Sequence, residues 1–237
     1  MDNVTNKSLG LQIYKNWHCN FPKEHFSLES DFPEIVLSEA RIDKLAQRVD
    51  LKGLRILELG CLEGVHSLIL QTLGVKEVLG IEGRKENFLK CLIAKNAFNL
   101  NKCKFLLGDL DEILPLLSGK FDLCFASGIL YHLENPVSTL FRISELTTKS
   151  LFAWTHYATV DFPKSPLVKI EYNERIYRGK HVRENLKDCL SGLRRNSFWL
   201  LEDDIFMAVK DAGFKDIEVI QKETHQHGPA ITFLARK

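Results

Sequence analysis

The alternation of short apolar runs with amphipathic stretches constrains the fold more than any other feature of this sequence. The apolar runs are residues 54–59, 75–82, 103–109, 121–127 and 150–157. Stretches of helical periodicity separate them, as in 65–74 and 84–100. Strands that alternate with helices in this way form parallel sheets through right-handed crossovers. Because each run is apolar on both faces, helices should cover the sheet on both sides.

The C-terminal part adds a helix and two further strands. Residues 202–214 have helical periodicity, and strands are predicted at 216–223 and 230–236. The loop between these strands is short enough for an antiparallel hairpin. The sequence therefore predicts an α/β fold with a doubly wound sheet of five parallel strands, a C-terminal antiparallel hairpin and helices on both faces.

We expect one domain over residues 1–237, because a chain of this length can bury a substantial core. Residues 1–50 would form an N-terminal cap segment and 51–157 the core of the sheet. Residues 158–198 are irregular and rich in charge, and form an insertion on the side where ligands bind in such sheets. Residues 199–237 supply the last helix and the hairpin.

The composition excludes several classes of protein. With 32 Lys+Arg and 31 Asp+Glu, the net charge is +1, which argues against a chain whose main task is to coat nucleic acid or an anionic membrane. The six cysteines form no CxxC pair, which favours reduced thiols in a cytoplasmic protein. We find no signal peptide and no apolar run long enough to span a membrane.

The turn after the first strand carries the clearest binding motif. In ELGCLEG the strand ends at Glu58, and Gly60 and Gly64 flank the turn into a helix. Glycines permit a tight turn and let a ligand approach the backbone beside a helix N-terminus. A dinucleotide fingerprint would have a middle glycine where Leu62 stands, and a P-loop would continue with Gly-Lys-Ser/Thr.

These residues resemble the class I S-adenosylmethionine-dependent methyltransferases of the small-molecule type, with similarity to the tRNA wobble-uridine carboxymethyltransferases. ELGCLEG resembles their first motif, and Glu82 and Asp109 match their acidic residues after the second and third strands. The segment FDLCFASGILYHL is similar to the motif that lines their reaction pocket. A flavin- or nicotinamide-binding Rossmann domain and a nonbinding α/β domain are the alternatives, but the C-terminal AGF helix and hairpin are expected of neither.

The resemblance implies S-adenosylmethionine as the cofactor and S-adenosylhomocysteine as its product. It implies that Glu58 supports the methionine end, that Glu82 accepts the ribose hydroxyls, and that Asp109 with Leu110 flanks the adenine. The other implied cofactor contacts are Gly60, Cys61, Gly64, Gly83 and Ser127.

Three residues near the ends of the fourth and fifth strands are the candidates for catalysis. Tyr131 and His132 follow the fourth strand, and His156 ends the fifth. A neutral imidazole can take a proton from the acceptor near working pH. We interpret His132 as the base, Tyr131 as a wall or hydrogen-bond donor, and His156 as an orienting partner, with a hydrogen-bonded pocket wall as the alternative for each. No metal site is predicted.

The sequence thus favours methyl transfer to an O or N atom of a small metabolite. A tRNA-modifying alkyltransferase and a catalytically silent cofactor-binding module are the alternatives, and tRNA is the less favoured partner because the net charge is near zero. Segment 164–195 carries nine Lys/Arg against four acids. It is either a solvated helical lid or the recognition site for an anionic acceptor, with Arg175, Arg178 or Arg183 as clamps.

Overall fold

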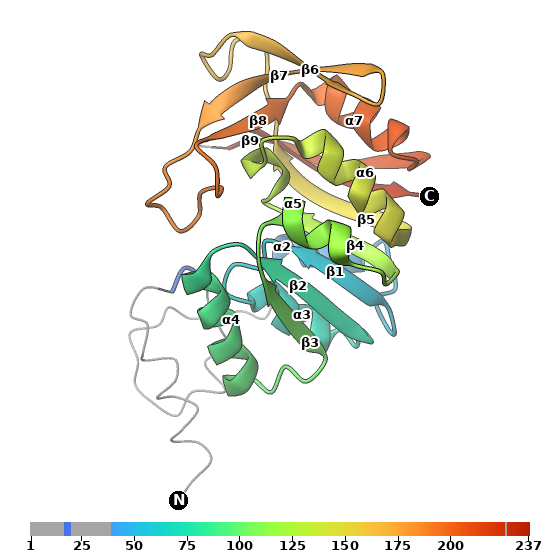
Figure 1. The fold of residues 1–237 in the computed structure, drawn as a ribbon. Coiled ribbons are helices and arrows are strands. Elements are labelled where there is room, and N and C mark those ends of the chain that lie inside the picture. Colours follow the sequence, from blue (N-terminus) through green and yellow to red (C-terminus); the bar gives the residue numbers. More distant parts are fainter. Residues whose placement is uncertain (1–16, 20–38, 226) are drawn as a thin grey trace, which may run out of the picture. The chain divides into compact units, whose positions relative to one another are not determined.

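The computed structural model describes residues 17–19, 39–225 and 227–237. It divides into two compact units, Met1–Gly108 and Asp109–Lys237, and each contains part of the predicted alternation of strands and helices (Figure 1). The predicted organisation as one domain, with a cap, a core, an insertion and a C-terminal part, stays a prediction.

The first unit contains a parallel sheet in the order β3-β2-β1. Its elements in chain order are α2 (Ala40–Ala46), β1 (Arg55–Leu59), α3 (Val65–Thr72), β2 (Glu77–Glu82), α4 (Lys85–Ala97) and β3 (Cys103–Leu107). Both α3 and α4 pack on β2 and β3. The apolar side chains of β1 and β2, among them Ile56, Leu57, Val78 and Ile81, are buried. Full burial of one such side chain contributes about 1.5–3 kcal/mol, so these two strands supply much of the core of this unit.

The second unit contains the remaining strands of the predicted sheet. Its elements begin with α5 (Leu110–Ile113), η2 (Leu114–Leu116), β4 (Phe121–Ser127), η3 (Leu130–His132), α6 (Pro136–Leu146) and β5 (Thr147–His156). They continue with β6 (Leu167–Tyr172), β7 (Arg175–Arg183), β8 (Asn196–Leu200), α7 (Glu202–Asp211), β9 (Asp216–His225) and β10 (Gly228–Arg236). β4 and β5 are parallel, and β10 pairs antiparallel with both β5 and β9. The predicted fold class, with five parallel strands and a C-terminal hairpin, is confirmed.

The insertion differs from the prediction. Residues 158–198 were expected to be irregular, but β6, β7 and β8 form an antiparallel sheet of three strands there. Charged residues occupy exposed positions of β6 and β7, while Tyr177, Gly179 and Lys180 are buried. The Lys180 ammonium donates to the carbonyls of Val160 (2.7 Å) and Pro163 (2.8 Å). Charged side chains at many strand positions therefore removed the apolar pattern by which these strands could have been predicted.

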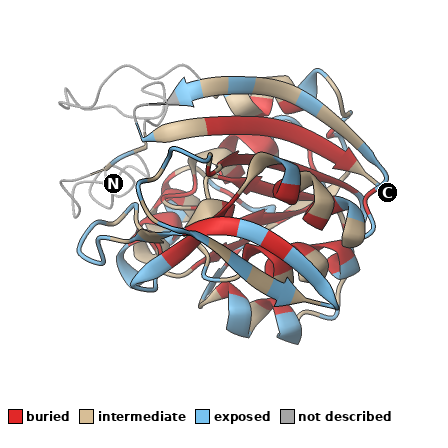
Figure 2. Cartoon of the chain, turned by 90° about the horizontal axis from the view of Figure 1, so that it is seen from above, coloured by how far each residue is buried: buried red, intermediate tan, exposed pale blue. Residues whose placement is uncertain are grey.

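Burial follows the strands (Figure 2). β4, β5 and β10 are buried along most of their length, whereas every residue of β6 is exposed or half-buried. Within the described ranges, no helix is both long enough and apolar enough to cross a membrane.

We predict that Gly179→Ala destabilises the protein. A Cβ at this position of β7 would overlap the carbonyl oxygen of Trp199 and lie 2.6 Å from Cε1 of Phe198, so the strand pair must separate. Overpacking of this kind typically costs about 1–3 kcal/mol. Urea denaturation should show the loss, whereas Ile176→Ala, at an exposed position of the same strand, should stay within about 0.5 kcal/mol of the wild type. Equal stability of Gly179→Ala and the wild type would contradict the packing of β7 on β8.

Candidate functional site

The loop between β1 and α3 passes through three left-handed backbone positions. The φ angle is +66° at Gly60, +51° at Leu62 and +88° at Gly64. The Gly60 amide donates to the carbonyl of Ile81 (2.9 Å), which anchors the loop to β2. Leu62 therefore adopts a backbone conformation that favours glycine, at the place where the sequence lacks the motif's middle glycine. When right-handed and left-handed backbone positions alternate, successive N–H groups point into one concavity, which suits anionic or oxygen-rich ligands.

Glu82, at the end of β2, holds this loop. One carboxylate oxygen accepts from the Leu62 amide and the other from the Arg84 amide, both at 2.9 Å. Burial raises the pKa of Glu82, although the bonds from Arg84, Leu62 and Asn87 act in the opposite direction. The structure thus places the predicted ribose acceptor against the glycine loop. A carboxylate has about four acceptor positions, so these three donors leave capacity for a ligand.

Glu58 is buried at the end of β1 with one oxygen unsatisfied. Its Oε2 accepts from the Ser67 hydroxyl. Its Oε1 is buried without a hydrogen-bond partner among the residues that the structure describes, and lies 3.6 Å from Nδ1 of His66. An orphaned buried acceptor is costly, and a ligand that carries donors would satisfy it. Together with Glu82 and the loop amides, this donor and acceptor set fits the ammonium and hydroxyl groups of the predicted cofactor.

The other predicted residues of the first unit lie in or beside the same loop. Cys61 is buried, its Sγ is 3.8 Å from Sγ of Cys91, and burial raises the pKa of its thiol, so it is an unreactive wall. Gly64 is the left-handed N-cap of α3. Gly83 is half-buried directly after β2.

Glu63 is a residue of this loop that the sequence analysis missed. Its side chain is fully buried, and it accepts from the amides of His18 (2.8 Å) and Cys19 (2.6 Å) and from the Lys90 ammonium (2.8 Å). Residues 17–19 are thereby tied to the glycine loop. A lysine buried on one face of α4 could have signalled a buried acidic partner.

In the second unit, Asp109 has partners from its own sequence neighbourhood and from the insertion. Its Oδ1 accepts from the Asp111 amide (3.1 Å) and caps α5, and its Oδ2 accepts from the Arg194 guanidinium (2.8 Å). Leu110 is buried beside it, and Ser127 is buried at the end of β4. Asp109 is thus the N-cap of α5, while the adenine contact stays a prediction.

His132 forms a short bond with a carboxylate of the insertion. Its Nδ1 is 3.0 Å from Oε1 of Glu184, which lies 52 residues along the chain. Burial alone would raise the pKa of Glu184, but the bonds from His132, the Gly192 amide and Ser197 hold it below its usual value. The sequence analysis missed Glu184, because the insertion carries no motif that points to it.

Tyr131 and His156 belong to an aromatic cluster at the ends of β4 and β5. The Tyr131 ring lies edge-on to His156, with ring centroids 4.7 Å apart. His156 stacks on Trp199 at 4.9 Å and is 5.0 Å from Trp154. Its Nδ1 is 3.1 Å from the Pro229 carbonyl, and a carbonyl can only accept, so Nδ1 donates and the ring is held in place. The structure therefore brings the three predicted catalytic residues together.

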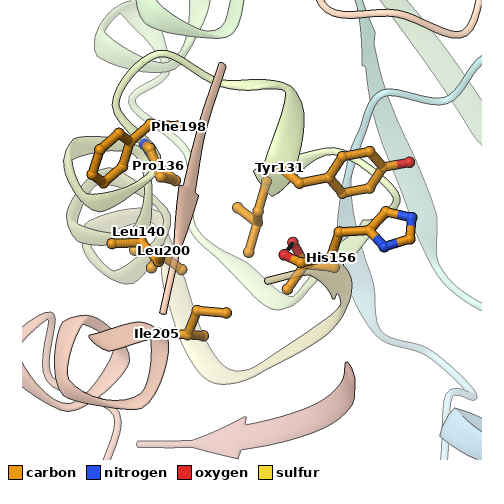
Figure 3. A pocket seen from close by; sticks show the side chains of 9 residues that line it. Tyr131, Pro136, Leu140, His156, Phe198, Leu200 and Ile205 are labelled. Carbon is orange, nitrogen blue, oxygen red and sulfur yellow. Dashed lines mark hydrogen bonds between the residues drawn. The ribbon is translucent and has the colours of Figure 1, made fainter. Parts of the chain in front are cut away.

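A small cavity adjoins this cluster, but it is not the acceptor pocket. Its volume of about 10 Å³ gives room for roughly one water molecule. The rings of Tyr131 and His156 extend away from its apolar walls (Figure 3). The labelled apolar walls are Pro136, Leu140, Phe198, Leu200 and Ile205.

The insertion's arginines are less available for an anionic acceptor than the sequence predicted. Arg178 donates from Nε and Nη2 to both oxygens of Asp204, which is fully buried. Arg175 is 3.9 Å from Asp211. Arg183 is exposed on β7.

The family described as "Methyltransferase domain" matches residues 50–202. The chain belongs to this family. The predictions of a methyltransferase and of S-adenosylmethionine as its cofactor are thereby confirmed at the level of the family. The N-terminal domain of EvdMO1, crystallised in the presence of S-adenosylhomocysteine and D-fucose, is 26% identical with a TM-score of 0.79; the match covers 100% of this methyltransferase chain and 97% of that one.

The curated relatives that match this chain in sequence are named tRNA U34 carboxymethyltransferase. The tRNA U34 carboxymethyltransferase of Colwellia psychrerythraea is 34% identical over 113 residues, which are 47% of this chain and 34% of the relative. That of Campylobacter concisus is 24% identical over 180 residues, or 74% of this chain and 60% of the relative. The methyltransferase chain therefore spans less than two thirds of the length of these relatives.

The left-handed conformation of Leu62 predicts an unusual order of stability. Alanine is ordinarily more stable than glycine by about 0.5–1 kcal/mol, but a positive φ reverses the order. We expect Leu62→Gly to unfold at higher urea concentration than Leu62→Ala. At Leu92, which is part-exposed in α4, the alanine variant should instead be the more stable of the pair by about 1 kcal/mol. The same order at both positions would contradict the left-handed backbone at Leu62.

Proposed function

We propose that this methyltransferase transfers a methyl group from S-adenosylmethionine to a hydroxyl group of a small, uncharged polar molecule, with a sugar as the acceptor class. The observation that carries the proposal is the cluster of His132, Tyr131 and His156 at the ends of β4 and β5. Ligands of open α/β sheets bind at this edge of the sheet. The similarity to a protein crystallised with D-fucose supports a sugar.

The cofactor residues are assigned by extension from the loop geometry. Glu58 and Glu82 would accept from the donor groups of S-adenosylmethionine, and the loop from Gly60 to Gly64 would offer it backbone amides. Asp109, Leu110 and Ser127 remain the proposed contacts from the second unit. When bound, S-adenosylmethionine supplies an electrophilic methyl group on a sulfonium.

The chain's own task is then to position the acceptor and take its proton. A hydroxyl is a poor nucleophile while it keeps its proton, and His132 would accept that proton. Tyr131 would serve as a wall or donor to the acceptor, and His156, held by Pro229, would orient it. Because positioning supplies much of the rate in such displacements, the rigid packing of these rings matters as much as the base.

A neutral acceptor agrees with the charges in the second unit better than an anionic one. Arg178 is held by Asp204 and Arg194 by Asp109, so each guanidinium already has a carboxylate partner. We also propose a cytoplasmic location, where free thiols such as the six cysteines of this chain stay reduced.

A tRNA-modifying activity is the second candidate function. It is favoured by the curated relatives named tRNA U34 carboxymethyltransferase. Incubation with the methyl donor or with its carboxymethyl counterpart, each labelled in the transferred group, and with either D-fucose and related deoxysugars or unmodified tRNA separates the two. Label in tRNA alone would overturn the sugar proposal.

We predict that Glu82→Ala weakens the binding of S-adenosylhomocysteine about 10- to 100-fold. The variant loses a charged acceptor worth about 1.5–3 kcal/mol, and it also frees the Leu62 amide. Isothermal titration calorimetry measures the change. Glu171→Ala, at an exposed position of β6, is the matched control and should bind like the wild type. Unchanged affinity of Glu82→Ala would remove Glu82 from the cofactor site.

We predict that His132→Ala lowers kcat by about 10²–10⁴-fold and leaves the affinity for S-adenosylhomocysteine unchanged, because only the base is removed. The transfer of labelled methyl groups to the sugar that proves to be the acceptor gives kcat. His227→Ala, at an exposed position directly before β10, controls for loss of a histidine. A kcat equal to that of the wild type would leave catalysis to positioning alone.

A further inference from the structure

Glu184 joins the insertion to η3 through one carboxylate oxygen and closes its own loop through the other. Oε1 is 3.0 Å from Nδ1 of His132, and Oε2 accepts from the Gly192 amide at 2.9 Å. The side chain of Glu184 is only 7% exposed. An ionised carboxylate can accept but not donate, so Nδ1 of His132 must carry the hydrogen of this bond.

The loop that carries Glu184 is closed and packed tightly on His132. The Glu184 amide donates to the Arg195 carbonyl (2.9 Å), which joins the two ends of the loop 184–195. A Cβ on Gly192 would lie 2.5 Å from the carbonyl oxygen and 3.2 Å from Cβ of His132. Only a glycine therefore allows this approach. The Phe198 amide of β8 donates to the carbonyl of Leu133 (2.8 Å), the residue that directly follows η3, and this bond also fixes the end of η3.

We propose that Glu184 is a positioning residue for His132, and that it holds the imidazole in the tautomer with hydrogen on Nδ1 and a proton-accepting Nε2. This proposal rests on the function proposed above. In other histidines that bond to a carboxylate, the partner of one ring nitrogen likewise decides which of the two nitrogens carries the hydrogen.

The pair makes the site specific for an acceptor that must lose a proton. In the proton-transfer step the O–H bond of the acceptor breaks, its electron pair stays on oxygen, and a new N–H bond forms at Nε2. The imidazolium that results is paired with the Glu184 carboxylate. A thiolate or a neutral amine needs no such base, so the pair agrees with the hydroxyl acceptor proposed above.

Few titratable groups among the described residues lie near His132, so a change in its protonation can be assigned to Glu184. Glu184 bonds to the ring, and Tyr131 on the same η3 and His156 on β5 lie in the adjoining aromatic cluster. β8, which packs on η3, has no charged residue. Among the described residues, substitution of Glu184 therefore changes the carboxylate that bonds to the ring.

The test compares Glu184→Gln with the wild type by ¹⁵N NMR of the histidine rings in the full-length protein. We expect the wild-type His132 ring to show hydrogen on Nδ1, and the Glu184→Gln ring to lose this preference. In Glu184→Gln, kcat should also fall about 10- to 100-fold, while KM and the affinity for S-adenosylhomocysteine stay unchanged. Glu171→Gln on β6 is the control and should change neither the spectrum nor kcat.

Two further variants keep the test decisive. If Glu184→Gln does not fold, Glu184→Asp retains the charge but shortens its reach, and the same loss of tautomer preference is expected. Gly192→Ala keeps both titratable groups and pushes the loop away from His132, so it should reproduce the change in the spectrum. A wild-type ring with hydrogen on Nε2, or a spectrum unchanged in all three variants, would overturn the role of Glu184. Failure of every hydroxyl acceptor, with the tautomer result intact, would overturn the proposed function instead.

Discussion

The bond from the Leu62 amide to the Glu82 carboxylate holds the loop on which the first unit's site depends. A leucine in the left-handed region costs roughly 1–2 kcal/mol. A hydrogen bond to a charged acceptor contributes about 1.5–3 kcal/mol, so this single interaction is large enough to offset the strain. The loop can therefore keep the conformation of a glycine motif without its middle glycine. Whatever binds at this loop meets a backbone that is already arranged.

The same device recurs in other loops of the chain. Glu63 accepts hydrogen bonds from the amides of His18 and Cys19, Asp109 caps α5, and Glu184 accepts a hydrogen bond from the Gly192 amide. In each case a carboxylate satisfies backbone donors that a loop would otherwise leave unpaired. Acidic residues that a sequence motif marks as ligand contacts therefore also hold their loops in shape. Loss of one of them can weaken binding through the loop as well as through the contact itself.

The repeating parts of the fold could be predicted from sequence, and the parts set by distant contacts could not. β4 begins and ends at the predicted residues 121 and 127, because apolar runs of that length report burial on both faces. The strands of the insertion were missed because their exposed positions carry charges, as at Lys169 and Arg178. Apolar periodicity cannot detect a strand whose buried face includes a lysine such as Lys180.

The candidate site shows the same limit. The motif residues Glu58, Glu82 and Asp109 were found by their position after strands, and Tyr131, His132 and His156 do lie together. The partners that define their state were not found, since Glu184 and Arg194 are distant in sequence and lie in a region without a motif. Pairing between distant residues is a property of the folded chain, and one sequence does not report it.

The partners of the insertion's basic residues bear on which class of acceptor would bind beside them. Binding to nucleic acid relies on cations that neutralise phosphates and release counterions. Here Arg178 and Arg194 are paired with carboxylates and Lys180 is buried on two carbonyls, so the excess of basic residues in 164–195 overstates the charge that a phosphate backbone would meet. A neutral hydroxylated molecule requires no such field. It requires oriented donors, acceptors and a base, and the His132–Glu184 pair among packed aromatic rings is an arrangement of that kind.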